Sequence, residues 1–138
     1  WPGKIDAGTE SGHLSAHYDF IATLAEVVGR DKPTGKDGIS YLPTLLGKPQ
    51  PTEHDHVVIN NHFSRMAKTC LITNEGWKLV EIDQKKNHYQ LYDLNNDNEE
   101  HHDLAAKHPD RVAALTAILK QELNSPRPDL LSAAERQQ

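Results

Sequence analysis

Hydrophobic and polar positions alternate with a two-residue period in the middle of the chain and with a helical period near its ends. The run from Trp77 to Tyr92 contains two strand-like stretches, 77–82 and 88–92, separated by the polar residues 83–87. Two such stretches around a short polar loop are typical of an antiparallel hairpin. Because side chains alternate along a strand, one buried face of the hairpin is expected to carry Trp77, Leu79, Tyr89 and Leu91.

Two further strands and a helix surround this hairpin in the sequence. Residues 56–63 alternate, with Val57, Ile59 and Phe63 on one side, and residues 66–73 lead through the turn 74–76 into the hairpin. Residues 109–123 begin with a proline and have apolar side chains at helical spacing: Val112, Leu115, Leu119 and Leu123. Each element has one apolar face to cover. The pattern therefore predicts an α+β fold, in which a small antiparallel sheet of about four strands is covered by a C-terminal helix.

The first third of the chain predicts helices and loops. Ser15 is expected to cap a helix whose apolar positions are Phe20, Ile21, Leu24, Val27 and Val28, and Gly29 is placed to end it. Asp19, near the start of that helix, is interpreted as favourable to the helix dipole. A short helix is expected over 40–46, ended by Gly47. The prolines at 49 and 51 then mark a boundary, which divides the chain into residues 1–50 and 51–138.

Composition excludes several classes of function. The chain has 138 residues, 36% of them hydrophobic and 25% charged, with a net charge of -5, which is ordinary for a folded domain. Scattered lysines and arginines argue against a nucleic-acid partner, and no apolar run has the length of a membrane span. The one cysteine, Cys70, cannot form an internal disulfide and is interpreted as a small buried hydrophobe.

Several short motifs follow one another along the chain: Trp1-Pro2-Gly3-Lys4-Ile5, Tyr18-Asp19-Phe20 with Thr23-Leu24, and the segments 37–47, 77–80, 89–94, 96–100 and 103–106. Their order and spacing resemble the C-terminal end of the type I sulfatases, the arylsulfatase family of the alkaline phosphatase superfamily. The resemblance is poor over 51–73 and over the last dozen residues. It implies that residue 1 is a cut, that residues 1–50 are the helical edge of a truncated α/β sulfatase domain, and that 51–138 form the C-terminal subdomain.

The same resemblance implies where the chemistry lies. Sulfatases use a formylglycine nucleophile, made from the first residue of a Cys/Ser-x-Pro-x-Arg motif, and a calcium ion that neutralises the sulfate. Cys70 precedes Leu71-Ile72-Thr73 and so lacks the motif. Calcium and formylglycine are therefore expected in a missing N-terminal catalytic domain, the main partner of this chain, and the chain alone is expected not to hydrolyse an aryl or sugar sulfate. The family also suggests a periplasmic or extracellular location.

Histidines supply the candidate site residues. His54, His56 and His62 share one parity, so a single extended strand would carry them on one face. The outer two would lie roughly 26 Å apart, too far for one zinc ion. The expectation is that these histidines are solvated or face a substrate, and that together with Arg65 they contribute to substrate selectivity.

No metal site is expected elsewhere in the chain. Asp93, Asn95 and Asp97 begin like a calcium loop, but an EF-hand requires glycine at its sixth position and glutamate at its twelfth. Asn98 and Leu104 occupy those positions. An acidic turn is therefore expected in this segment.

Three points leave the function open. Many sulfatases carry an arginine five residues before the position of Lys78; Thr73 stands there, so a bidentate donor is lost and the substrate class is open. A free-standing module that binds an anionic sugar or a protein is one alternative, although the eight aromatic residues are spread out. The tail of a related phosphohydrolase is another.

Apolar positions on the first helix also predict self-association, if no sheet covers them.

Overall fold

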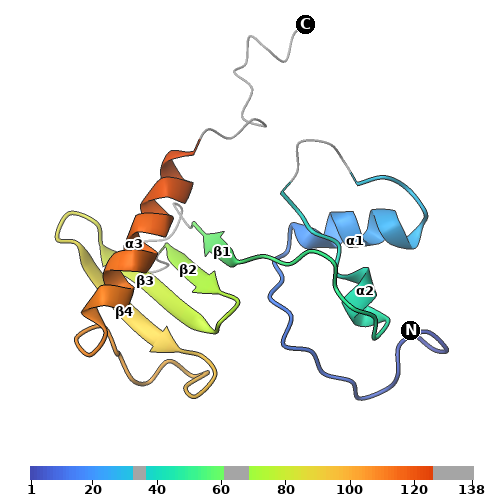
Figure 1. The fold of residues 1–138 in the computed structure, drawn as a ribbon, viewed down its shortest axis with the longest axis horizontal. Helices are drawn as coiled ribbons and strands as arrows, with labels where there is room; N and C mark the ends of the chain where they lie inside the picture. The colour runs from blue at the N-terminus through green and yellow to red at the C-terminus, as the bar shows by residue number, and fades with distance from the viewer. Residues whose placement is uncertain (33–36, 61–68, 126–138) are drawn as a thin grey trace, which may run out of the picture. The chain divides into compact units, whose positions relative to one another are not determined.

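The computed structural model describes residues 1–32, 37–60 and 69–125 (Figure 1). By backbone proximity the chain divides between His54 and Asp55 into two compact units, Trp1–His54 and Asp55–Ser125. The assignment of residues 1–50 to a larger α/β domain and of 51–138 to a subdomain stays a prediction. The helices in the described ranges are all too short or too polar to cross a bilayer.

The first unit contains two helices, α1 (Asp19–Val27) and α2 (Leu42–Leu45). The predicted cap at Ser15 is wrong, because α1 begins four residues later, after Tyr18. The predicted end is confirmed: Gly29 has a φ of 66° and donates its N–H to the carbonyl of Glu26. A positive φ strains every residue except glycine, so this position stops the helix.

The second unit is a four-stranded antiparallel sheet in the order β1-β2-β3-β4. Its strands are β1 (His56–Ile59), β2 (Cys70–Thr73), β3 (Trp77–Asp83) and β4 (His88–Asp93). The predicted hairpin is confirmed to within one residue at its ends. The two earlier strands had been predicted over 56–63 and 66–73, and residues 61–68 of those predictions lie outside the described residues.

The helix α3 (Pro109–Asn124) covers one face of this sheet (Figure 1). Register places Leu71 opposite Leu79 and Leu79 opposite Leu91, so three fully buried leucines form a row under the helix. Leu115 and Leu119 of α3 pack on that row together with Tyr89. Each such leucine contributes about 1.5–3 kcal/mol through burial, so this row is the main source of stability in the second unit. The predicted α+β arrangement is confirmed.

The segment between β4 and α3 is held by an aspartate. Asp97 accepts hydrogen bonds from the backbone N–H groups of His101 and His102, at 3.0 and 2.7 Å. These donors favour the ionised carboxyl, and they lower the pKa of Asp97 below its ordinary value of 3.8. The segment is thus an acidic turn closed by its own backbone, as expected.

Candidate functional site

His54 is the last residue of the first unit and lies before β1, so it is not part of a strand. Its Nε2 lies 2.9 Å from Oδ1 of Asp19, and the two side chains are 10% and 1% exposed. The ring of Tyr18 meets the His54 ring edge-on, with centroids 5.7 Å apart. The prediction that one strand presents three histidines on one face is therefore wrong for His54.

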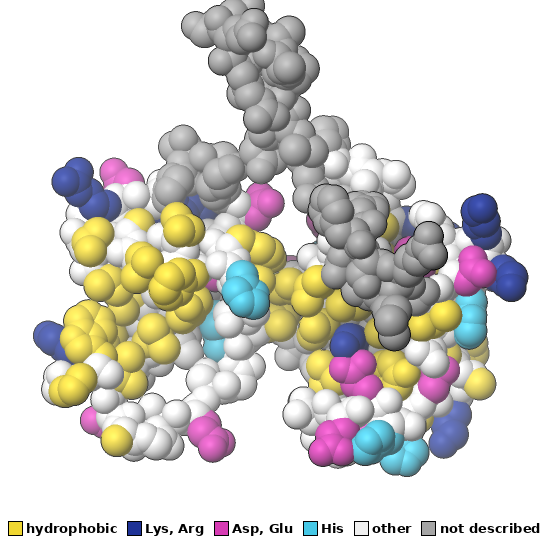
Figure 2. Space-filling view, turned by 180° about the vertical axis from the view of Figure 1, so that it is seen from behind, with side chains coloured by type: hydrophobic (Ala, Val, Ile, Leu, Met, Phe, Trp, Pro, Cys, Tyr) yellow, Lys and Arg dark blue, Asp and Glu magenta, His cyan; other side chains and the backbone are white. Residues whose placement is uncertain are grey.

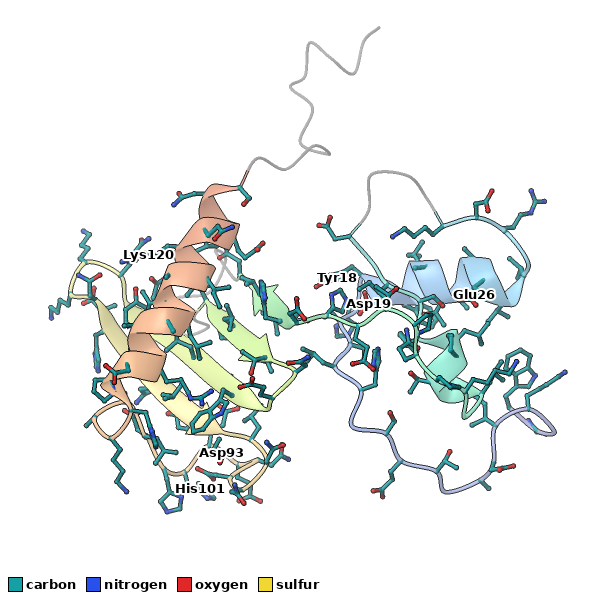
Figure 3. All side chains as sticks on the ribbon, viewed as in Figure 1. Tyr18, Asp19, Glu26, Asp93, His101 and Lys120 are labelled. Carbon is teal, nitrogen blue, oxygen red and sulfur yellow. The ribbon has the colours of Figure 1, made fainter. Side chains whose placement is uncertain are left out.

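Asp19 holds three separate segments together (Figure 3). Besides His54, its carboxylate accepts the N–H of Ala16 at 2.7 Å and the N–H of Ile39 at 2.8 Å. A buried carboxylate is stable only when donors replace its water, and three donors meet that need here. Its role is thus wider than the expected interaction with the helix dipole.

Gly38 makes the contact with Ile39 possible. A Cβ atom on Gly38 would lie 2.5 Å from the carbonyl oxygen of Tyr18, which is backbone and cannot turn aside. Residues 38 and 39 can therefore approach the start of α1 only because residue 38 has no side chain.

His56 lies on the side of β1 that α3 covers. It shares that side with Val58, which pairs with Leu71 and packs against the core. Its Nε2 is 3.4 Å from a carboxylate oxygen of Glu122 on α3, and both side chains are partly exposed. An ion pair of this kind contributes little, at most about 1 kcal/mol. The predicted parity of His56 is right, but that side of the strand packs against the helix.

His62 and Arg65 lie outside the described residues. The contact of the four candidates with a substrate stays a prediction.

The apolar positions of α1 face outward. Asp19, Ala22 and Thr23 form the buried side of this helix, whereas Phe20, Ile21, Leu24 and Val27 are 38–55% exposed, and Val28, which follows the helix, is 68% exposed. Figure 2 shows hydrophobic side chains gathered over the first unit, at the left of the view. Exposed apolar patches of this kind mark surfaces that another element covers.

Cys70 is a buried residue of β2. Burial raises the pKa of its thiol, and the sequence around it lacks the Pro and Arg of the formylglycine motif. A thiol in this state is a poor nucleophile. In the described ranges, no three histidine, cysteine or acidic side chains come close enough together to bind a metal ion. These residues therefore do not fit the calcium or the nucleophile of a sulfatase.

Sequence reasoning missed one surface cluster at the start of α3. The guanidinium of Arg111 lies over the ring of Trp77 at 4.4 Å and is 3.2 Å from a carboxylate oxygen of Glu75. The ring of His108 meets Trp77 at 5.5 Å. Beside them is a hollow of about 430 Å³ lined by Lys107, His108, Asp110 and Arg111, among others. Only the sequence His108-Pro109, a helix start, pointed to this place.

Comparison with known proteins finds relatives that are described as sulfatases. An N-acetylgalactosamine-6-O-sulfatase of Bacteroides thetaiotaomicron is 28% identical over 135 residues, which is 87% of this chain and 25% of the relative. A solved structure described under glycosaminoglycan metabolism by the same organism is 27% identical, with a TM-score of 0.66 over 88% of this chain and 27% of that one. A structure of a 2-O GAG sulfatase is 28% identical, with a TM-score of 0.62 over 73% of this chain and 23% of that one.

The chain spans about a quarter of the length of these relatives. The profile of one protein family, described as N-sulphoglucosamine sulphohydrolase, C-terminal, matches residues 1–129, which is nearly the whole chain. This match agrees with the motifs found in the sequence and with the fold. The chain therefore belongs to this family of sulfatase C-terminal regions.

Proposed function

We propose that this chain is the C-terminal part of a sulfatase that removes sulfate from a carbohydrate of the glycosaminoglycan type. The family match over residues 1–129 carries the proposal. The substrate class is supported by the names of two relatives, an N-acetylgalactosamine-6-O-sulfatase and a 2-O GAG sulfatase. Thr73 lacks a bidentate donor, so recognition of the sulfated sugar falls to other residues.

The first contribution of the chain is packing. The exposed side of α1 supplies four large apolar side chains, which is what a helix at the edge of a larger domain would bury. We assign the catalytic portion of the enzyme as the partner that covers it. Calcium and the formylglycine nucleophile belong to that portion, where they would stabilise and attack the sulfate group.

The second contribution is substrate selectivity. His62 and Arg65 remain candidates for contact with the sulfated sugar, and a protonated imidazole or a guanidinium suits an anionic group. His54 and His56 are weaker candidates, because each imidazole already contacts a carboxylate of this chain. A periplasmic or extracellular location would suit a polysaccharide substrate.

Sulfate release tests the proposal. The protein that joins this chain to the catalytic portion is incubated with 6-O-sulfated N-acetylgalactosamine, with a 2-O-sulfated disaccharide and with an aryl phosphate, and free sulfate and phosphate are measured by ion chromatography. We expect sulfate from at least one sugar, and its loss on calcium removal. The 138-residue chain alone is the control and should release none.

Each other outcome contradicts a stated part of the proposal. Phosphate release without sulfate would identify a phosphohydrolase, and sugar binding without release would identify a binding module. Release of sulfate by the chain alone would overturn the assignment of the chemistry to the catalytic portion.

A further inference from the structure

The two edges of the sheet in the second unit differ in how their backbone groups are satisfied. At the β4 edge, Leu91 donates its N–H to a carboxylate oxygen of Asp103 at 3.1 Å, and its carbonyl accepts the N–H of Leu104 at 2.8 Å. The segment between β4 and α3 therefore blocks the edge at Leu91. Blocking an edge in this way keeps other chains from pairing with it.

The β1 edge has no comparable cover within the second unit. The carbonyl of Asp55 accepts the N–H of Asn74, on the side of β2. Because backbone groups alternate in direction along an antiparallel strand, Val57 also bonds to β2. His56 and Val58 then direct their N–H and carbonyl groups away from the sheet. Among the described residues of the second unit, none makes a hydrogen bond with these outward groups.

The side chains of β1 do not protect its edge. Proteins usually protect an open edge with lysine, proline or a bulge. The strand His56–Ile59 contains no lysine or proline, and it pairs with β2 residue for residue. Ile59 is 50% exposed, and no other large hydrophobic side chain is exposed in the part of the second unit that the structure describes. An open backbone edge and an exposed apolar side chain thus coincide on one strand.

We propose that the β1 edge pairs with the β1 edge of a second copy of this chain, so that the two sheets join across a twofold axis. An antiparallel arrangement centred on Val57 places His56 opposite Val58 of the second copy, and Val58 opposite its His56. Each outward N–H then meets an outward carbonyl. A twofold interface requires a surface that is complementary to itself, and this edge meets that requirement.

The side chains also fit a second copy. Val57 and Ile59 point to the face of the sheet away from His56 and Val58, because side chains alternate along a strand. In the proposed arrangement, Ile59 lies diagonally across from Val57 of the second copy and gains an apolar neighbour. The strand has only four residues, so the pairing involves few hydrogen bonds and the dimer is weak.

Proline and alanine at position 56 give a matched test. Both substitutions remove the imidazole and its approach to Glu122 at 3.4 Å, but only proline also removes the outward N–H. Proline is tolerated on an edge strand where the missing N–H faces away from the sheet, so the bonds from β1 to β2 should persist. All samples carry Leu24→Asp, which removes association through the apolar side of α1.

Sedimentation equilibrium of the 138-residue chain measures the dissociation constant of the dimer. We expect His56→Ala to change this constant by about twofold or less, and His56→Pro to raise it at least tenfold. Amide exchange at Val58 should slow as the concentration of the chain rises. Exchange at Leu79, inside the sheet, should be the same in all three proteins. The measurement at Val58 needs no change at position 56, so it remains decisive if proline disturbs the sheet.

Several outcomes would overturn the proposal. These are a monomer at every concentration, equal dissociation constants for the alanine and proline variants in an intact sheet, and exchange at Val58 that does not depend on concentration. Slow exchange at Val58 in a monomer of the protein that includes the catalytic portion would assign the edge to that portion instead, and would equally contradict a second copy. None of these results depends on sulfate release, so the proposed function can fail independently.

Discussion

Two leucine-to-alanine substitutions test which faces of α3 and α1 are buried. Leu119 of α3 is fully buried, whereas Leu24 of α1 is 43% exposed. Alanine is at least as good a helix former as leucine, so neither substitution should weaken its helix locally. Any difference in the free energy of unfolding must then come from packing.

The magnitude for Leu119→Ala follows from its surroundings. The side chain packs in the cluster with Leu71, Leu79 and Leu91, and a sheet of four paired strands cannot collapse into the cavity. A cost of about 3 kcal/mol is expected, in the middle of the range for buried leucines. This corresponds to a fall of roughly 12–24 °C in the Tm of a domain of this size. Leu24→Ala should change the free energy of unfolding by about 0.5 kcal/mol or less.

Urea titration followed by the fluorescence of Trp77, in a Trp1→Phe background, reports on the second unit, and far-ultraviolet circular dichroism reports on both. The samples are kept dilute so that self-association does not add to the result. If Leu24→Ala cost as much as Leu119→Ala, the apolar side of α1 would be buried within the chain. The interpretation of α1 as a helix with its apolar side outward would then be refuted.

Three further predictions concern a glycine, an aspartate and the surface of α1. Gly38→Ala should cost about 1–3 kcal/mol, because its Cβ would clash with the carbonyl of Tyr18, whereas Gly12→Ala, where nothing lies within 4 Å, should be near neutral in a thermal melt. The pKa of Asp97 is lowered in the folded protein, so the stabilising contribution of its carboxylate is present above pH 3.8 and is lost as the pH falls through the folded pKa. The rate of amide exchange at His101 and His102 should therefore increase in acid, and Asp97→Asn should remove that increase. The chain should self-associate in sedimentation experiments and Leu24→Asp should weaken this; a clean monomer at high concentration would contradict it.

The second unit was predictable because its signals are local. Apolar and polar side chains alternate in Trp77-Lys78-Leu79 and in Tyr89-Gln90-Leu91, so the sequence indicates which hairpin side chains share a face, and the buried Leu79 and Leu91 follow from it. The apolar stripe of 109–123 indicated the side of α3 that packs on the sheet. In β1 the sequence Val57-Val58-Ile59 is apolar without interruption, so alternation could not show that the side carrying His56 is the one under α3.

The first unit was less predictable because long-range contacts determine it. Ser15 has the right chemistry for a helix cap, but the carboxylate of Asp19 takes the N–H of Ala16, and the helix starts after that turn. Two partners of Asp19, Ile39 and His54, lie 20 and 35 residues away in sequence. No local pattern predicts such pairs, and an aspartate near a helix start has an ordinary local interpretation.

The orientation of α1 follows from what each of its sides needs. The segment around Ile39 is irregular, and its backbone N–H groups require acceptors, which the polar side of α1 provides through Asp19 and Thr23. The other side has no polar partner to satisfy, and it needs an apolar surface. Its four large side chains, Phe20, Ile21, Leu24 and Val27, are about half exposed, so covering them is worth roughly 3–6 kcal/mol together. Whole domains are stable by only about 5–15 kcal/mol. The stability of the first unit therefore depends strongly on the surface that covers α1, which in our proposal belongs to the catalytic portion of the enzyme.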